Sequence, residues 1–288
     1  MKLIKFSIIL ILFCSPLKFL SQSISKERIR KLKRCVVKVF IENGESVGTG
    51  FFISSYGDIL TCWHVIKPAI KTDSLGHILG IKNIYITLTN RDTIEVKIPL
   101  QYFTNAAKNK NAVSYDYCIL TPSKKIKDKT DFFKLGSFED IDEGDEIYTA
   151  GYPLGIDNQF LSKGVLSTKY IDSSIFVNGN IKVRRTVALL DLTMNRGNSG
   201  GPIIKIGKNI DEDKVIGIAD FLLTKNGTNA ESLIKELNDR RMNISIDDGK
   251  GNLLCLTDVF KMFAEAIAYS SIGISGCISI NHFLQSSE

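Results

Sequence analysis

The chain has 288 residues, of which 44% are hydrophobic and 24% are charged. This composition excludes an intrinsically disordered or low-complexity protein, and the length provides for one large domain or two small ones. The formal net charge of +6 is too mild to indicate a nucleic-acid-binding protein. Six cysteines are too few for a disulfide scaffold of this size.

The first 21 residues predict a cleaved signal peptide. Lys2 and Lys5 precede a short apolar run from Phe6 to Cys14, and small polar residues follow at Ser21, which is the order of a secretory signal. The run is shorter than the roughly 20 apolar residues of a membrane span, so an uncleaved anchor is the less favoured alternative. Cleavage would remove three lysines and leave a charge of +3, and would also leave five cysteines, an odd number.

Residues 25–34 predict a short amphipathic helix. Ser25 is its candidate N-cap, and Ile29 and Leu32 share one face. Six basic residues lie between Lys26 and Arg34, and positive charge directly after an apolar run tends to stay inside the cell, which weighs against export. We expect a solvated helix face, with contact to an anionic surface as the alternative.

From residue 35 onward the chain has the pattern of an all-β protein. Short apolar and β-branched runs recur between turn signals about every 8–12 residues, as in sandwiches and barrels. The predicted strands are 36–41, 48–53, 59–61, 84–88, 93–98, 117–120, 146–150, 164–168, 174–177, 181–190, 203–206 and 215–219. Apolar residues with helical spacing predict minor helices at 230–241 and 257–269.

Residues 197–202 read Gly-Asn-Ser-Gly-Gly-Pro and predict the nucleophile of a hydrolase. A nucleophilic serine lies on a tight turn whose backbone N–H groups converge on the developing oxyanion. Gly197 permits such a turn, and Gly200 and Gly201 permit close approach of neighbouring backbone. Ser199 is therefore the candidate nucleophile, and a glycine-rich turn between strands is the structural alternative.

A nucleophilic serine needs a general base, and His64 is the candidate. It follows the apolar strand Ile59–Thr61, whereas His77 lies in a polar turn and His282 lies near the end of the chain. The sequence contains no zinc motif, phosphate loop or haem motif, so we expect no metal site and no cofactor.

The base in turn needs an acid that orients it. Asp116 lies at the start of an apolar strand, where its carboxyl can be buried beside the imidazole and hold one tautomer. Asp58, Asp73 and Asp92 compete for this role, but each lies in a polar turn. Asp116 is therefore the favoured acid.

The order of His64, Asp116 and Ser199 resembles that of trypsin-like serine peptidases of the chymotrypsin clan, and the surrounding segments resemble most the bacterial HtrA (Deg) type protease domain. The likeness extends over nearly all of the chain after the signal peptide. It is carried by residues 47–53, 60–65, 135–137, 144–146, 151–153, 164–167, 191–196, 215–218, 272–275 and 280–284.

The resemblance implies a fold and a domain plan. A peptidase domain would extend over residues 22–288, with two six-stranded antiparallel β-barrels at about 35–125 and 135–288. The active site would lie between the barrels. Too few residues follow the last strand for the PDZ domain that many HtrA proteins carry. A helical insertion at about 223–270, before the last strand, is predicted as a lid, a specificity element, an oligomer contact or a surface packing unit.

The resemblance also implies the chemistry. Ser199 would attack a peptide carbonyl and form an acyl-enzyme, with His64 as base and Asp116 as its partner. The N–H groups of Gly197 and Ser199 would form the oxyanion hole. We expect protein or peptide substrates, no nucleic acid, no stable membrane span, and a secreted or periplasmic location. Nothing in the sequence indicates the oligomeric state.

The same resemblance implies substrate binding along the strand after Gly217, which would pair with extended substrate. The candidate substrate-binding residues are Thr193, Ala219, Asp220, Phe221, Leu222 and Gly273. Thr193 stands six residues before the serine, where cleavage after Lys or Arg would need an acid, so we expect a small or medium apolar side chain in the pocket. Asp220 departs from the family, which usually has a small polar residue near the triad acid. Its carboxylate would repel Asp116 or shift its pKa, or else face solvent.

Three alternatives stay open. The first alternative to an active peptidase is a catalytically latent trypsin-fold protein that binds partners in the envelope. The second is an interaction protein anchored in the membrane through residues 3–20. Cys62 and Cys118 each lie two positions from a candidate triad residue, and they are either a pair or, as we favour, two buried free thiols.

Overall fold

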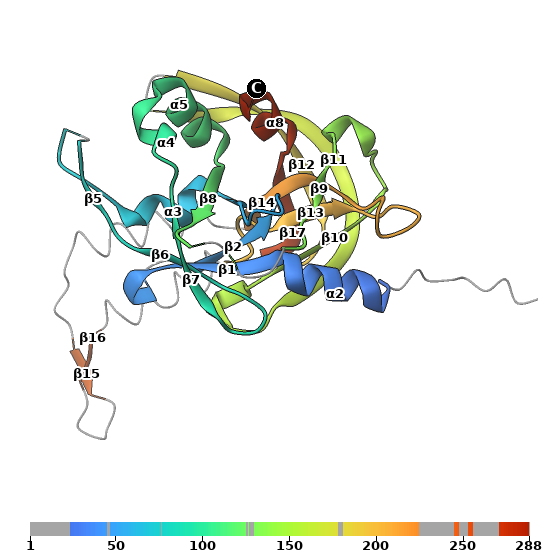
Figure 1. Cartoon of the computed structure of the whole chain (residues 1–288), viewed down its shortest axis with the longest axis horizontal. Coiled ribbons are helices and arrows are strands. Elements are labelled where there is room, and N and C mark those ends of the chain that lie inside the picture. The colour runs from blue at the N-terminus through green and yellow to red at the C-terminus, as the bar shows by residue number, and fades with distance from the viewer. Residues whose placement is uncertain are drawn as a thin grey trace, which may run out of the picture.

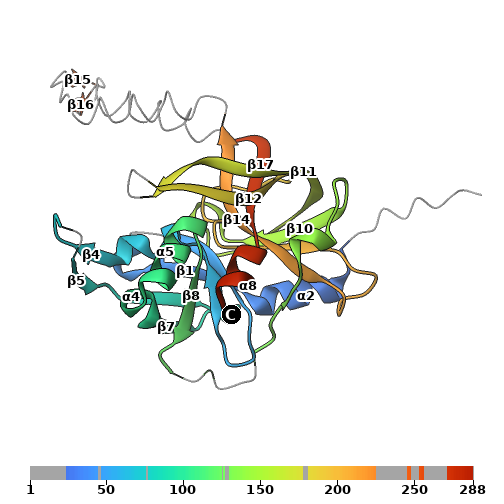
Figure 2. The same ribbon diagram turned by 90° about the horizontal axis from the view of Figure 1, so that it is seen from above.

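The computed structural model describes residues 24–44, 47–75, 77–124, 126, 130–177, 181–224, 245–247, 253–255 and 271–287 of the chain. Strands predominate in this part, and the helices are short. The strands form two main sheets, one from each half of the chain, which lie one above the other in Figure 2.

The first sheet closes on itself as a six-stranded barrel. Its strands pair in the order β1, β2, β3, β8, β7, β6 and return to β1, and all of these pairings are antiparallel. They are β1 (Val36–Ile41), β2 (Val47–Phe52), β3 (Ile59–Thr61), β6 (Ile84–Thr87), β7 (Thr93–Lys97) and β8 (Cys118–Pro122). Val37, Val39 and Ile41 of β1 are buried in the core, because alternate residues of a strand face the same side.

The second sheet closes in the same way. Its antiparallel order is β13, β10, β11, β12, β17, β14, and pairing of β13 with β14 completes the barrel, while the short β9 adds to β14 in parallel. These strands are β9 (Lys134–Leu135), β10 (Glu146–Gly151), β11 (Phe160–Val177), β12 (Ile181–Asp191), β13 (Pro202–Lys205), β14 (Lys214–Thr224) and β17 (Ser271–Ser279). The predicted double barrel is confirmed.

One long strand replaces two predicted ones. The pattern predicted separate strands at 164–168 and 174–177, but β11 is continuous over 18 residues and curves around the second barrel in Figure 1. Its register against β12 shifts between Leu166 and Thr168 and again between Asp172 and Ile175. Such bulges bend a strand without ending it and interrupt the alternation of side chains, so the sequence pattern breaks where the strand does not.

The helices and smaller elements connect these strands. They are α2 (Lys26–Cys35), η1 (Glu42–Gly44), α3 (Trp63–Ile66), η2 (Lys67–Ala69), α4 (Gln101–Thr104), α5 (Ala106–Tyr115), η3 (Phe138–Asp140), η4 (Pro153–Gly155) and α8 (Asn281–Ser287), with hairpins β4 (Ile70–Thr72)–β5 (Ile78–Ile81) and β15 (Ser245–Asp247)–β16 (Leu253–Cys255). The sequence pattern did not predict α4 or α5. In α5 polar residues are spread around the helix, so no apolar face marks it.

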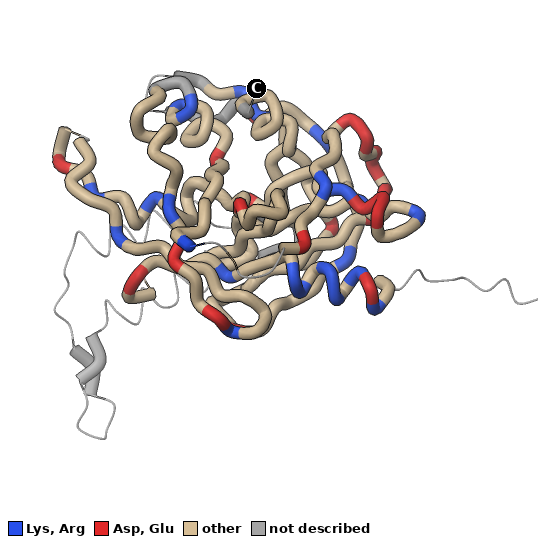
Figure 3. Tube along the Cα trace, viewed as in Figure 1, with Lys and Arg blue, Asp and Glu red and all other residues tan. Residues whose placement is uncertain are grey.

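The basic segment forms the predicted helix, α2, with Ser25 accepting from the Arg28 N–H at its N-terminus. Figure 3 shows the Lys and Arg residues along this helix. Arg28 differs from the solvated face that we predicted, because its guanidinium points inward and pairs with Asp213 at 2.8 Å. Asp213 is fully buried and also accepts from the Tyr148 hydroxyl. This ion pair fixes α2 to the second barrel.

Several predictions lie outside the described residues. They include the signal peptide at 1–21 and the helices at 230–241 and 257–269, so the insertion at 223–270 is described only at the end of β14 and in β15 and β16. Within the described residues, no helix is long and apolar enough to cross a membrane.

Candidate functional site

His64 lies at the start of α3, directly after β3 of the first barrel. Its backbone N–H donates to Asp116 Oδ1 at 2.8 Å, and its ring Nδ1 lies 2.5 Å from Asp116 Oδ2. The two carboxylate oxygens therefore hold one residue at two points, which fixes the ring and leaves Nε2 for a substrate or nucleophile. The imidazole is 45% exposed and so is accessible.

Asp116 owes its position to the end of a helix. It follows α5 and precedes β8, with a positive φ of 51°, a conformation that aspartate tolerates better than most residues. The N–H of Tyr117 donates to Ala112 O and closes the helix end. The abrupt change of direction brings the carboxyl to His64, and the sequence pattern missed α5 although it favoured Asp116.

The three competing aspartates lie elsewhere. Asp58 bonds to Ser54 within a turn, and Asp92 accepts from Asn90 within another. Asp73 bonds to His77, whose side chain is 72% exposed. These are local turn contacts, and none joins His64.

Ser199 lies in the loop between β12 and β13 of the second barrel. Gly197 and Gly200 in this loop have φ of 95° and 85°, values that favour glycine. A Cβ on Gly197 would lie 2.3 Å from Tyr152 O, and one on Gly200 would lie 2.2 Å from Thr49 O. The loop therefore needs glycine both for its backbone angles and for its close packing.

Backbone bonds join the serine loop to the first barrel. The N–H of Thr49 in β2 donates to Ser199 O at 2.9 Å, and the Thr49 hydroxyl donates to Gly197 O at 2.6 Å. Among the bonds between described residues, the N–H groups of Gly197 and Ser199 have no acceptor, whereas that of Gly200 donates to Ala219 O. The two unused donors suit an oxyanion hole.

The Ser199 hydroxyl is oriented toward β14. Oγ donates to the carbonyl oxygen of Asp220 at 3.5 Å, and the side chain of the same Asp220 has Oδ1 3.7 Å from His64 Nδ1. Asp220 therefore contacts both the candidate nucleophile and the candidate base, through different groups.

The second carboxyl shifts the protonation of the site. Burial raises the pKa of Asp220 to about 8, together with the charge of Asp116, although Arg185 and His64 oppose the rise. Burial also acts to raise the pKa of Asp116, but the hydrogen bond and charge of His64 outweigh it and lower the value. Burial acts to lower the pKa of His64, but Asp116 and then Asp220 outweigh it, so the pKa rises. Sequence reasoning missed Arg185, because nothing in β12 marks it.

His282 has a structural role. Its Nε2 accepts the Thr186 N–H at 2.8 Å, and its ring stacks on Tyr115 with centroids 4.2 Å apart. These contacts hold α8 beside α5, where Figure 1 places the C-terminus. Burial and then the charge of Arg185 lower the pKa of His282 to about 4, so its ring is neutral and serves as an acceptor.

The candidate substrate-binding residues are only partly described. Thr193 is exposed and Ala219 is buried. For Phe221 and Leu222 in β14, and for Gly273 in β17, the backbone alone is described. On its β13 side β14 is paired only as far as Ile218, whereas pairing with β17 extends to Thr224.

Cys62 and Cys118 are free and buried, so the prediction of two thiols is confirmed. Side-chain donor atoms of Cys62, His64, Asp116 and Asp220 lie within 4.8 Å of one another, a donor set of the kind that zinc uses. However, the Cys62 thiol donates to Ala219 O at 3.3 Å and burial raises its pKa well above its usual value, which opposes the thiolate that a metal requires.

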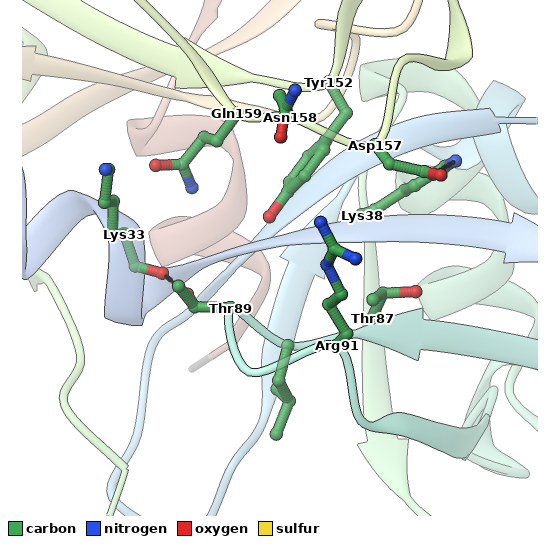
Figure 4. Close-up of a pocket in the computed structure, with 10 residues that line it drawn as sticks. Lys33, Lys38, Thr87, Thr89, Arg91, Tyr152, Asp157, Asn158 and Gln159 are labelled. Carbon is green, nitrogen blue, oxygen red and sulfur yellow. Dashed lines mark hydrogen bonds and ion pairs between the residues drawn. The ribbon is translucent and has the colours of Figure 1, made fainter.

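A separate cavity of 630 Å³ lies beside η4 (Figure 4). Lys38 points into it and is paired with Asp157 at 2.7 Å. Its other lining residues are Lys33, Thr87, Leu88, Thr89, Arg91, Tyr152, Asn158 and Gln159. None of these residues is among the candidate site residues, so this cavity is not part of the candidate site.

A model of a protein family described as "Trypsin-like peptidase domain" matches residues 48–218. Among curated proteins, the magnetosome formation protease MamE of Magnetospirillum gryphiswaldense is 25% identical over 64% of this chain and 20% of its own length. The putative protease Do-like 14 of Arabidopsis thaliana is 29% identical over 62% of this chain and 36% of its own length. A probable periplasmic serine endoprotease DegP-like of Pseudomonas putida is 26% identical over 64% of this chain and 31% of its own length.

The chain thus spans about a fifth to a third of the length of these curated relatives. Among solved structures, HtrA-type protease AlgW with tripeptide aligns with a TM-score of 0.54 and 17% identity, over 90% of this chain and 60% of that one. At this identity the likeness shows a shared fold.

Proposed function

The chain belongs to the trypsin-like peptidase domain family, and from this premise we propose that it is a serine endopeptidase with Ser199 as nucleophile, His64 as general base and Asp116 as the acid that orients the base. The likeness to HtrA-type proteases that the sequence indicated is confirmed. The observation that carries the proposal is the two-point contact of Asp116 with His64.

The proposed reaction has two halves. Ser199 Oγ attacks the peptide carbonyl while His64 Nε2 takes its proton, and His64 then gives that proton to the leaving amine as the acyl-enzyme forms. Water, deprotonated by His64, attacks the ester, and His64 returns that proton to Ser199 Oγ as the carboxylic acid product is released. Asp116 stays ionised throughout and keeps the proton of His64 on Nδ1, which leaves Nε2 as the acceptor.

We assign stabilisation of the substrate oxyanion to the backbone N–H groups of Gly197 and Ser199. Their N–H groups have no acceptor among the described residues, and such donors each contribute about 3–4 kcal/mol of barrier lowering in enzymes of this type. The positive φ of Gly197 supports the assignment.

Substrate is proposed to add to the open edge of β14. Ala219 still bonds through its N–H and C=O to Gly201 and Gly200 of the serine loop, but beyond it no described strand pairs with this edge, so an extended peptide can supply the missing strand. The Asp220 carbonyl, which now accepts from Ser199 Oγ, would accept a substrate N–H instead. That exchange would release the hydroxyl to turn toward His64. The proposed specificity pocket prefers a small or medium apolar side chain of the substrate. Its proposed residues are Thr193, Phe221, Leu222 and Gly273.

The present orientation of Ser199 also fits the second candidate, a latent trypsin-fold module, because its hydroxyl bonds to a carbonyl that substrate would use. A fluorophosphonate probe separates the two functions. We expect labelling of the wild type and none of Ser199→Ala or His64→Ala, with circular dichroism confirming that both variants fold. Absence of Ser199-dependent labelling, with and without peptide substrates, would overturn the active-enzyme proposal.

Export completes the proposal. The predicted signal at residues 1–21 and the periplasmic name of a relative support a secreted or periplasmic peptidase domain of residues 22–288, with barrels at about 35–125 and 135–288. Intact mass of protein recovered from the envelope distinguishes cleavage near Ser21 from an uncleaved anchor. Full-length mass would contradict the signal-peptide proposal.

A further inference from the structure

Asp220 places a second carboxyl against the His64–Asp116 pair. Its side chain is only 9% exposed, and Asp116 beside it is 14% exposed. One oxygen, Oδ1, faces His64 Nδ1 at 3.7 Å, and the other, Oδ2, faces Arg185 Nη1 at 3.4 Å. A carboxyl oxygen of Asp220 and one of Asp116 also lie within 4.8 Å of each other. Two carboxylates cannot share a hydrogen bond unless one of them carries a proton.

Arg185 links Asp220 to a third carboxyl group, that of Asp172. These three residues, together with His64 and Asp116, form a charge cluster. Arg185 belongs to β12, and its guanidinium is 8% exposed. Nη1 faces Asp220, while Nη2 lies 3.4 Å from Asp172 Oδ2 in β11. Its Nε is buried and has no partner among the described residues. The guanidinium is thus divided between two carboxyl groups at long distances and neutralises neither one fully.

Charge counting favours a proton on Asp220. With His64 neutral and Asp116, Asp220 and Asp172 all ionised, the cluster would carry three negative charges against the one positive charge of Arg185. A proton on Asp220 reduces the net charge from −2 to −1. In a buried site a carboxyl group keeps such a proton at pH values well above the usual pKa of aspartate, as in the carboxyl pairs of other enzymes.

Among the residues that the structure describes, charged or titratable groups from several elements face Asp220. They are His64 of α3, Asp116 before β8, Arg185 of β12, Cys62 before α3 and Cys277 of β17. Both cysteines are buried, and burial raises the pKa of each thiol, so they stay neutral. Arg185 is therefore the permanent positive charge in this set, and it opposes the retention of the proton.

We propose that Asp220 is a positioning residue that acts in its protonated form: its carboxyl O–H donates to Asp116 and holds that carboxylate against His64, and loss of this proton at alkaline pH lowers the rate of hydrolysis. The inference rests on the proposed peptidase function. On ionisation the proton passes to solvent, and the resulting carboxylate repels Asp116 and competes with it for the Nδ1–H of His64. Because this disturbs the base and not the substrate edge, the loss is in kcat more than in KM.

The pH profile of kcat and KM tests the proposal. We expect the wild type to lose kcat on the alkaline side. Asp220→Asn keeps an N–H donor for Asp116 and cannot ionise, so its alkaline fall disappears and it retains more activity at neutral pH than Asp220→Ala, which has no donor. Asp220→Ser, with a hydroxyl, behaves like Asp220→Asn. The proposal is overturned if kcat of Asp220→Asn still falls at alkaline pH as in the wild type. It is also overturned if Asp220→Asn loses as much activity at neutral pH as Asp220→Ala.

Two further variants shift the alkaline fall in opposite directions. Asp172→Asn removes the other partner of Arg185, so Arg185 stabilises ionised Asp220 more strongly and the fall moves to lower pH. Arg185→Gln removes the positive charge, so the fall moves to higher pH. Shifts of the same sign, or none in folded protein, contradict the charge cluster.

A measurement without turnover separates this inference from the proposed function. Carbon NMR of labelled aspartate carboxyls in Ser199→Ala follows each protonation directly. We expect one carboxyl that titrates above neutrality in Ser199→Ala and disappears in the double variant with Asp220→Asn. If that signal is present but the wild type is not labelled by the probe, the peptidase function fails and the proton assignment stands. If no carboxyl titrates above neutrality, the assignment fails regardless of activity.

Discussion

The backbone N–H of Leu154 donates to the carbonyl oxygen of Arg196 at 2.5 Å, and this bond joins the segment after β10 to the loop that holds Ser199. Gly197 follows Arg196 and lies against the carbonyl of Tyr152, where an added Cβ would come within 2.3 Å. The geometry of the proposed oxyanion hole therefore depends on η4 and its neighbours as well as on the serine loop itself.

Gly197→Ala tests this dependence. The methyl group would collide with backbone, and φ of 95° disfavours alanine, so the Gly197 N–H would turn away from the oxyanion. We expect kcat to fall about 100-fold or more, the loss typical of a missing oxyanion donor. Gly80→Ala, at an open position in β5, is the matched control. Equal activity of the two variants would contradict the assignment.

Asp116→Asn should impair the action of His64 as general base. The amide keeps the size of the side chain, but it allows the wrong tautomer of His64, and a loss of about 10⁴-fold in kcat is expected on this mechanism. The chain offers a matched control, because Asp73 and His77 form a similar pair at 2.9 Å on the surface. Asp73→Asn should leave activity as it is. Steady-state kinetics on both variants decide whether Asp116 is the functional partner.

The loss of activity at acid pH should report the protonation of His64. A general base must be unprotonated, so activity is present above the pKa of His64 and is lost as pH falls through it. The hydrogen bond and charge of Asp116 raise that pKa above the ordinary value of 6.5, and the acid midpoint is expected there. A titration of the His64 ring by NMR should give the same midpoint. A midpoint below 6.5 would mean that burial outweighs the effect of Asp116.

The ion pair of Arg28 with Asp213 should contribute to stability. Asp213 is fully buried and accepts from Arg28, Tyr148 and the Gly207 N–H, so removal of the guanidinium leaves a buried charge without its partner. Arg28→Met is expected to lower the free energy of unfolding by about 3–5 kcal/mol.

Arg34 provides the control for that measurement. It pairs with Asp131 on the surface, where the two side chains are 57% and 49% exposed, and such pairs contribute about 0–1 kcal/mol. Urea unfolding of Arg28→Met and Arg34→Met should therefore differ clearly in midpoint. Similar midpoints would show that α2 is not fixed by its buried ion pair.

Local sequence decided much of the fold and part of the site. Alternating apolar residues predicted the strands, because burial of one face needs a period of two. The string from Gly197 to Pro202 predicted the serine turn, because the φ values and close contacts at Gly197 and Gly200 exclude side chains there. Both signals lie within a few residues of the feature they specify, and so they can be read without the fold.

Only the tertiary structure decided the rest. Asp116 contacts His64 across 52 residues of sequence, whereas the competing aspartates bond within their own turns. Arg28 reaches Asp213 across 185 residues, and Arg185 meets Asp220 from a different strand. Which charges meet depends on how the barrel strands are paired and on where bulges turn them, and no local pattern carries that information. The sequence by itself indicated the family, most of the strands and the candidate nucleophile; the packing of the two barrels determined the partners of its charges.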